Sequence, residues 1–233
     1  MEREPNVQFD IQKELKGIVP SAIEIITKPD AFFSRMAKTG GFLQPLLFMV
    51  ILGTASAIIS WFLSLIGFGP AGARTSILLT IILVPILIAI VGFISAAILF
   101  VIWKLMGSQE SYETAYRGMA YTAAILPITA VLNIIPYIGT VVGLLWLTYL
   151  LVVISITVHS IKAKTAWVGF GIICAVLVIF SLSTEFAARR MMREMESWQR
   201  DSRFQSESME EMTPEEISEA MAEFLKSMQE NRE

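Results

Sequence analysis

Apolar residues come in five long runs along this chain, and short polar segments separate the runs. The runs are approximately Leu43–Phe68, Ser76–Trp103, Gly118–Ile135, Ile138–Val158 and Ala166–Thr184. A helix needs roughly 20 apolar residues to cross about 30 Å of hydrocarbon. We therefore expect an all-α polytopic bundle of about five transmembrane helices.

The third run, Gly118–Ile135, is the shortest and most polar. Only the sequence "PYIG", Pro136–Gly139, separates it from the fourth run. Proline and glycine predict a tight helical hairpin there. The alternative is a single kinked span with a re-entrant piece over residues 118–158. Pro85 and Pro127 lie inside runs two and three, and each should kink its helix because proline lacks a backbone donor.

Composition supports a membrane protein. The chain has 233 residues, of which 55% are hydrophobic and 17% charged, against about 25% charged in an average soluble domain. Between Phe42 and Thr184 the only charged residues are Arg74, Lys104, Glu110, Glu113, Arg117, Lys162 and Lys164. We expect the lipid bilayer as the main partner. The expected parts are an interfacial segment (1–42), a transmembrane domain (43–184) and a helical, acidic tail (185–233).

The positions of lysine and arginine predict orientation, because cytoplasmic loops carry an excess of both. One expected side carries Lys28, Arg35, Lys38, Lys104, Arg117, Lys162 and Lys164. This pattern favours a cytoplasmic N-terminus. Five spans then put the C-terminus outside, where Arg189, Arg190 and Arg193 run against the rule. The side of the tail is left open.

Small residues recur at a spacing of four in four of the runs. The pairs are Gly53 and Ala57, Gly92 and Ala96, Gly139 and Gly143, and Gly171 and Ala175. This spacing lets helix backbones approach closely in lipid, where packing drives helix association. The pairs are candidate helix-packing sites of a compact bundle.

The segment "TKPDAFFSRM" before the first run combines apolar rings with cations. Its Pro29, Phe32, Phe33 and Arg35 are typical of a segment at the membrane interface, with rings toward the acyl chains and cations toward the phosphates. The segment either anchors the start of the first span or binds a partner.

Several stretches resemble the Yip domain family of small, multi-span membrane proteins. They are "IITKPDAFFSRM" followed by "PLLFMVIL", "SYETAYRGMAYTAAILPI", "IIPYIG" and "VHSIKAKTAWV", within roughly Lys16–Ser183. The resemblance implies five spans, a cytoplasmic N-terminus and no known enzymatic activity. Eukaryotic members associate with Rab-type GTPases and with each other. The short N-terminus here resembles prokaryotic members, which implies a prokaryotic cytoplasmic membrane, and the Rab association is not carried over.

The sequence contains no recognisable catalytic, cofactor-binding or metal-binding set. The five runs contain no Asp, Glu, Lys or Arg, whereas proton relays and ion pathways use such residues. His159 is the only histidine, so a site of several imidazoles is excluded, and nucleic-acid binding lacks a basic patch. Thr122, Thr129 and Asn133 form a polar stripe in the third run. It predicts either hydrogen bonds between helices or a pathway for a polar solute.

The tail holds a second helix signal. Thr213, Pro214 and Glu216 form a helix start, and an apolar face follows at Ile217, Met221, Phe224, Leu225 and Met228. The acidic surroundings disfavour docking to anionic lipid, so the face predicts contact with an unknown protein partner or another copy. A solvated tail is the alternative.

Together these features predict a non-enzymatic membrane adaptor or organiser that acts by self-association and partner binding. The alternative is a small-solute transporter or channel that uses the polar stripe. Neither partner nor solute is readable from the sequence.

Overall fold

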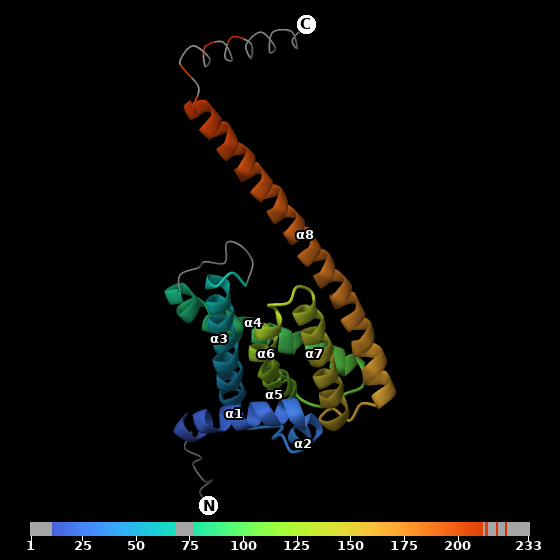
Figure 1. Ribbon diagram of the computed structural model, residues 1–233. Helices are drawn as coiled ribbons and strands as arrows, with labels where there is room; N and C mark the ends of the chain where they lie inside the picture. The colour runs from blue at the N-terminus through green and yellow to red at the C-terminus, as the bar shows by residue number, and fades with distance from the viewer. Residues whose placement is uncertain (1–10, 69–76, 212, 214–217, 219–221, 223–233) are drawn as a thin grey trace, which may run out of the picture. The chain divides into compact units, whose positions relative to one another are not determined.

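The computed structural model describes residues 11–68, 77–211, 213, 218 and 222, and the regular elements in these residues are helices (Figure 1). They are α1 (Ile11–Thr27), α2 (Pro29–Ser34), α3 (Leu43–Leu65), α4 (Ile77–Leu105), α5 (Tyr112–Tyr121), the 3₁₀ helix η1 (Thr122–Ile125), α6 (Leu126–Leu132), α7 (Ile138–Thr157) and α8 (Ala163–Glu211). Among them α3, α4, α7 and α8 are long and apolar enough to cross a membrane. The expected all-α, multi-pass architecture is confirmed.

The chain divides into two compact units inside α8. The first unit ends at Ser183 and the second begins at Thr184. Helices α1 to α7 and the first part of α8 belong to the first unit. The apolar tail face at Ile217, Met221, Phe224, Leu225 and Met228 lies outside the described residues.

Helices α3 and α4 pack through two glycines. A Cβ on Gly53 would lie 2.5 Å from Cδ1 of Ile88, and one on Gly92 would lie 2.3 Å from Cε of Met49. The two contacts run in opposite senses along the helices, so α3 and α4 are antiparallel neighbours. Ala96 is fully buried one turn beyond Gly92, and Ala57 is half-buried.

The third expected span forms as a broken helix. It begins at Tyr112 rather than near Gly118, and it runs through α5, η1 and α6. Pro127 stands in the first turn of α6 and cannot donate a backbone hydrogen bond. The helix therefore tightens to 3₁₀ geometry just before the proline. By contrast, α4 continues through Pro85 as one helix.

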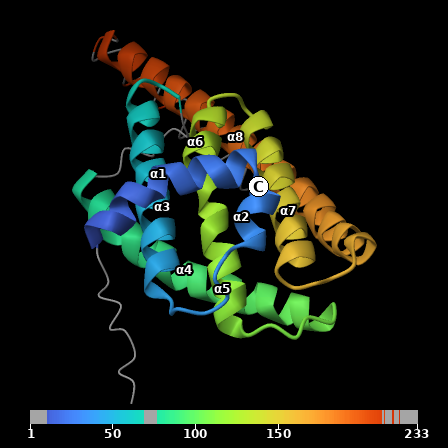
Figure 2. The ribbon, with the colours of Figure 1, turned by 90° about the horizontal axis from the view of Figure 1, so that it is seen from below.

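The broken helix runs antiparallel to α7 over the length of α7. In the second half of α5, a Cβ on Gly118 would lie 3.1 Å from Cγ2 of Ile154, near the C-terminal end of α7. At the turn, a Cβ on Gly139 would lie 2.5 Å from the backbone nitrogen of Asn133. Both ends of the pair are thus in register, and α6 and α7 stand side by side in Figures 1 and 2. The broken helix and α7 thus form the hairpin expected of the third and fourth runs, although α5, η1 and α6 are not among the four helices long and apolar enough to cross a membrane.

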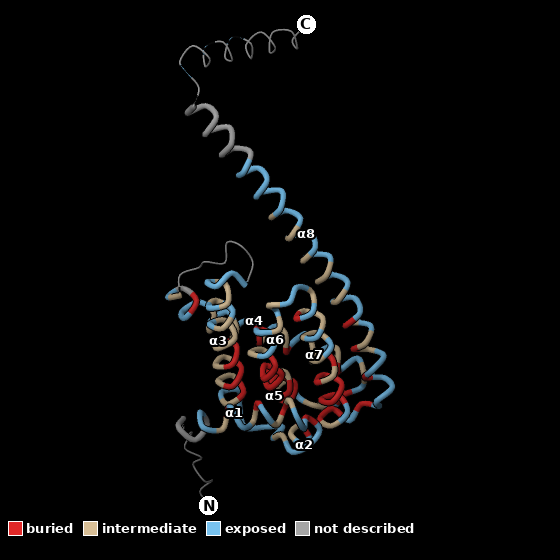
Figure 3. Tube along the Cα trace, in the orientation of Figure 1, coloured by how far each residue is buried: buried red, intermediate tan, exposed pale blue. Residues whose placement is uncertain are grey.

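The best-buried part of the bundle is α5 and the helix faces around it. In Figure 3 the buried residues concentrate on α5 and on parts of α3 and α7. Large side chains such as Trp103, Tyr116, Leu150 and Ile154 are fully buried there. Helix α4 instead exposes a continuous series of leucines, isoleucines and valines, including Ile90 at 53%. Such a surface is stable only where lipid tails cover it.

Helix α1 lies across the end of the bundle from which α3 begins (Figures 1 and 2). Its residues Ile18, Ala22 and Ile25 are buried against the bundle, whereas Val19 and Ile23 on another side are more than half exposed. Helix α2 follows after Lys28 and starts with Pro29, which suits the first helical position. Together α1 and α2 cover one end of the transmembrane helices.

Gly139 and Gly171 give a matched test of the packing. The Gly139→Ala substitution places a methyl group against the backbone of Asn133, which cannot move away as a flexible side chain would. We expect it to cost about 1–3 kcal/mol of stability. Gly171 has no atom within 4 Å of its would-be Cβ, so Gly171→Ala should change the melting temperature in detergent little or raise it. Equal melting temperatures for the two variants would contradict the hairpin register.

Candidate functional site

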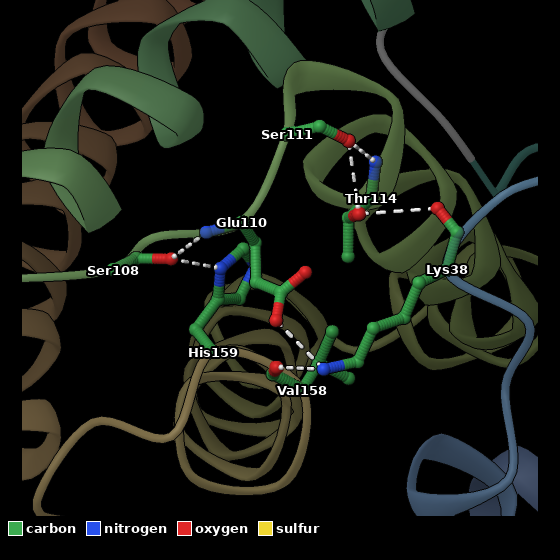
Figure 4. A network of polar contacts seen from close by, with 7 residues as sticks. All are labelled: Lys38, Ser108, Glu110, Ser111, Thr114, Val158 and His159. Atoms are coloured by element: carbon green, nitrogen blue, oxygen red, sulfur yellow. Dashed lines mark hydrogen bonds and ion pairs between the residues drawn. The ribbon is translucent and has the colours of Figure 1, made fainter.

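Three loops meet at the end of the bundle covered by α1 and α2. They are Arg35–Phe42, Met106–Ser111 and Val158–Lys162, and we call their meeting point the loop junction. The Lys38 ammonium joins all three, because Nζ donates to Oε1 of Glu110 at 2.7 Å and to the carbonyl oxygen of Val158 at 3.1 Å (Figure 4). Residues far apart in the sequence are therefore held at one point.

The start of α5 holds the first of these loops. Ser111 caps α5 by accepting a hydrogen bond from the Thr114 backbone nitrogen at 3.2 Å. The Thr114 hydroxyl then donates to the carbonyl oxygen of Lys38 at 3.1 Å (Figure 4). Oε1 of the preceding residue, Glu113, accepts from the Gly41 backbone nitrogen at 2.6 Å. The helix start and the loop thus satisfy each other's polar groups.

Arg117 makes the deepest contact with the same loop. Its side chain donates through Nε to the Ala37 carbonyl at 2.7 Å, through Nη1 to the Gly41 carbonyl at 2.8 Å, and through Nη2 to Oε1 of Gln44 at 3.3 Å. The residue is only 3% exposed, and it is the one charged residue found buried in the described part of the chain. Neutral oxygens therefore accept hydrogen bonds from a buried guanidinium, which fastens α5 to the loop before α3.

His159 forms a second polar cluster at the loop junction. Its Nδ1 lies 2.7 Å from the Ser108 hydroxyl, which also accepts from the Glu110 backbone nitrogen (Figure 4). Its ring stacks on Trp103, with centroids 4.1 Å apart. The Trp103 indole in turn donates to the Ser155 hydroxyl at 2.8 Å. This cluster joins the ends of α4 and α7.

Burial holds His159 in its neutral form. The pKa of the imidazole is lowered from 6.5 to about 4, chiefly because burial removes its solvation. The nearby Glu110 raises the pKa, and Lys38 and Lys104 lower it. The Ser108 hydroxyl is placed to donate to Nδ1, which suits the neutral ring. Ser108 and His159 resemble a nucleophile with its base, but they are 2% and 4% exposed. A substrate has no access to the pair, so its chemistry is structural.

The expected interfacial residues lie at the same end. Pro29 is buried, and Phe33 is 1% exposed within the core. Phe32 packs edge-on against Tyr121 at a centroid distance of 5.1 Å. Arg35 is exposed and forms an ion pair with Glu24 of α1. The protein itself therefore covers the two phenylalanine rings, and the cation faces away from the core.

The two threonine hydroxyls of the polar stripe donate hydrogen bonds to carbonyls of their own broken helix. The Thr122 hydroxyl donates to the Met119 carbonyl at 2.7 Å, and the Thr129 hydroxyl donates to the Leu126 carbonyl at 2.9 Å. Asn133 is exposed at the turn before α7, where its Oδ1 lies beside Gly139. The two hydroxyls thus stay within one helix and leave no bond to a neighbouring helix.

Of the candidate packing residues, those of α3, α4 and α7 stand at helix contacts and those of α8 do not. Gly143 faces Thr129, whose Cγ2 would lie 2.9 Å from an added Cβ. Gly171 and Ala175 face no other part of the described chain closely, since Gly171 has no neighbour within 4 Å and Ala175 is exposed.

The sequence reasoning missed the roles of Trp103, Arg117 and Glu113. The sequence did contain a signal for the two charged residues. Glu113 and Arg117, together with Glu110, are three of only seven charged residues between Phe42 and Thr184. Charges that persist beside an apolar run usually have a partner inside the protein. Among the described residues, no three His, Cys, Asp or Glu side chains come together as a metal site.

The comparisons with known proteins identify one family. The model of the Yip1 domain matches residues 23–184 of the chain, which include the last five residues of α1, all of α2 to α7 and the first part of α8. Neither the search of curated proteins nor the search of solved structures found a match.

The hold of Arg117 on the first loop can be tested by proteolysis. Lysine in place of arginine keeps the charge but cannot reach three acceptors at once. We expect Arg117→Lys to speed cleavage by trypsin after Lys38 in detergent several-fold. The control is Arg190→Lys, whose side chain is exposed and lies in the other unit. Equal cleavage of both variants would show that Arg117 does not fasten the loop.

The buried His159 predicts a loss of stability in acid. The unfolded imidazole binds a proton below about pH 6.5, but the folded one does so only near pH 4. Stability therefore falls as the pH drops from about 6.5 to about 4, by at most about 3 kcal/mol.

The measurement is the melting temperature at pH 7.5 and pH 4.5. The His159→Phe variant keeps a ring on Trp103 but cannot titrate, so its melting temperature should fall less between the two values. An equal fall in both proteins would mean that His159 does not carry the effect.

Proposed function

We propose that this chain, which belongs to the Yip1 domain family, is a non-enzymatic membrane organiser that acts by self-association and by partner contacts at its two ends. Its family and its apolar helices make it a multi-pass membrane protein. The organiser role, the prokaryotic cytoplasmic membrane and the cytoplasmic N-terminus are the proposed part.

The observation that carries the proposal is where the buried polar groups lie in the bundle. The buried charge of Arg117 and the buried His159 both lie at the loop junction. Inside the described spans, the buried hydroxyls of Thr148 and Ser155 donate to carbonyls of their own helix. A protein that moves ions or protons typically carries ionisable side chains across the membrane. Among the described residues of these helices, the buried polar atoms without a partner belong to Thr54, Tyr116 and Trp146, and none belongs to an Asp, Glu, Lys or Arg. The arrangement here supports a rigid bundle with a fixed end surface.

The loop junction supports a persistent surface for partners. Side chains of α5 hold the backbone of the loop before α3 at Ala37, Lys38 and Gly41. Helices α1 and α2 are thereby fixed against the end of the bundle rather than tethered by a free linker. A preorganised surface binds a partner with a smaller entropy cost than a mobile one.

The loop junction also supports a cytoplasmic N-terminus. Lys38 belongs to the short loop that Arg117 binds, its ammonium bonds to the Val158 carbonyl of a second loop, and Lys104 lies in the last turn of the helix that leads to Ser108. The cations near these three loops therefore lie on the same side of the membrane, and the positive-inside rule makes that side the cytoplasmic one. Five crossings then place Thr184 at the opposite side.

The alternative of a solute pathway gains no support from the polar stripe. The Thr122 and Thr129 hydroxyls are used within their own helix, so they offer no open ladder of donors and acceptors. The organiser role is the one that the geometry favours.

Two measurements on the full chain distinguish these functions. In single-molecule photobleaching of the fluorescently tagged chain in native membranes, an organiser should bleach in two or more steps. In proteoliposomes, it should not raise the flux of small polar solutes above that of empty vesicles. Single-step bleaching together with solute flux that Asn133→Leu or Thr129→Val abolishes would favour the transporter instead.

A further inference from the structure

The second unit begins where the family domain ends. The Yip1 domain match stops at residue 184, and the second unit starts at Thr184, yet α8 continues to Glu211 without interruption. The part from Ala163 to Thr184 is already long enough to cross the hydrocarbon at about 1.5 Å per residue. The continuation therefore needs an explanation of its own.

The continuation cannot be hydrocarbon-embedded, because it is rich in charge. Residues 185–200 contain Glu185, Arg189, Arg190, Arg193, Glu194, Glu196 and Arg200. Two of the acids pair with arginines one turn away, Arg189 with Glu185 at 2.8 Å and Arg190 with Glu194 at 3.0 Å. Pairs with this i, i+4 spacing favour a helix that is exposed to water.

A stripe of large apolar side chains nevertheless runs along this charged helix. Met191, Met195 and Trp198 are 66%, 52% and 79% exposed, and Ala188 is exposed as well. A soluble helix gains nothing from exposing methionines and a tryptophan in line. The stripe indicates a surface that another helix covers.

The spacing of the stripe identifies the kind of partner. Ala188, Met191, Met195 and Trp198 follow at intervals of three, four and three residues, the a and d positions of a heptad repeat. In the sequence, Met209 falls on a later a position of the same repeat, after the polar Ser202 and Gln205. The charged residues between 187 and 204 all fall on the b, c, f or g positions, and none on a, d or e.

We propose that residues 188–209 of α8 pair with the same segment of a second copy of this chain as a parallel, two-stranded coiled coil. Two copies in one membrane have the same orientation, so their α8 segments run parallel, and a two-fold axis brings each a or d residue against its own counterpart. The pairing covers the stripe with an identical stripe. This inference rests on the self-association in the proposed function and names its surface.

The observations favour a second copy over a membrane surface. Residues 172–211 contain neither glycine nor proline, and sharp bends in helices nearly always occur at such residues or at local insertions. The segment also carries five arginines against four acids between residues 185 and 203, so its attraction to anionic lipid is weak. A facing copy satisfies the stripe without any bend.

Disulfide crosslinking tests the pairing in the native membrane. Cys174 is the only cysteine, so the background is the full chain with Cys174→Ser. Single cysteines are introduced by Met191→Cys and Met195→Cys on the stripe, and by Arg193→Cys and Arg200→Cys as matched controls at f positions. After mild oxidation, we expect covalent dimers from the two stripe variants and several times less from the two controls.

A second substitution tests the stripe itself. Trp198→Glu added to Met195→Cys should abolish the crosslink, because it places two carboxylates against each other in the seam. Arg200→Glu added to Met195→Cys should leave it intact. These substitutions lie outside the first unit. Equal crosslinking at all four positions, or none at any, would overturn the coiled coil.

Two shortened chains separate this inference from the proposed function. If the chain ending at Ser183 still bleaches in two steps while the stripe variants fail to crosslink, self-association stands and the coiled coil is wrong. If the full chain bleaches in one step and does not crosslink, both fail. If only the chain ending at Glu211 crosslinks, the tail beyond it covers the stripe, and the pairing does not exist in the full chain.

Discussion

The lack of hydrogen-bond partners in hydrocarbon governs this structure. Every polar group that enters the membrane must be satisfied by the protein itself. Thr148 and Ser155 meet this requirement by bonding to carbonyls of their own helix, and Ser56 of α3 bonds to the Leu126 carbonyl of a neighbouring helix. The Thr54 hydroxyl is the exception among these groups, because it is buried without a partner in the described part of the chain. The stronger groups, the Arg117 guanidinium and the His159 imidazole, lie instead at the loop junction, where loop carbonyls and hydroxyls are within reach. The position of the polar chemistry follows from this one requirement.

Glycines then decide how closely the apolar helices pack. Gly53 and Gly92 bring α3 against α4, and Gly139 brings the turn before α7 onto the backbone of Asn133. In lipid the hydrophobic effect does not drive helices together, so the close approach of helix backbones has to supply the stability. Gly171 of α8 differs, because no atom of the described chain lies within 4 Å of its would-be Cβ. Glycine is thus a close helix contact at Gly53, Gly92 and Gly139, but not at Gly171.

Much of the fold could be predicted from the sequence, because the length of an apolar run directly indicates a membrane-spanning helix. The broken third crossing was harder. Its Pro127 predicted a kink. The sequence did not predict that the helix begins at Tyr112, because the charged Glu113 and Arg117 are typical of a loop unless their partners on the loop before α3 are known. The contact of His159 with Trp103 and Ser108 joins residues about 50 positions apart, and no local pattern encodes such a pair. Phe33 likewise resembled a lipid-facing ring, although tertiary packing buries it.

The break in the third crossing also has a consequence for how the protein is made. A segment that carries Arg117 and loses regular helical hydrogen bonds at η1 is a poor substrate for independent insertion into lipid. Helix α7 is strongly apolar and follows after only a short turn, so the two segments can leave the translocation machinery together as a preassembled hairpin. The shortness of the turn at Pro136 then matters during biogenesis, since it lets the apolar partner arrive before the polar segment has to face lipid alone.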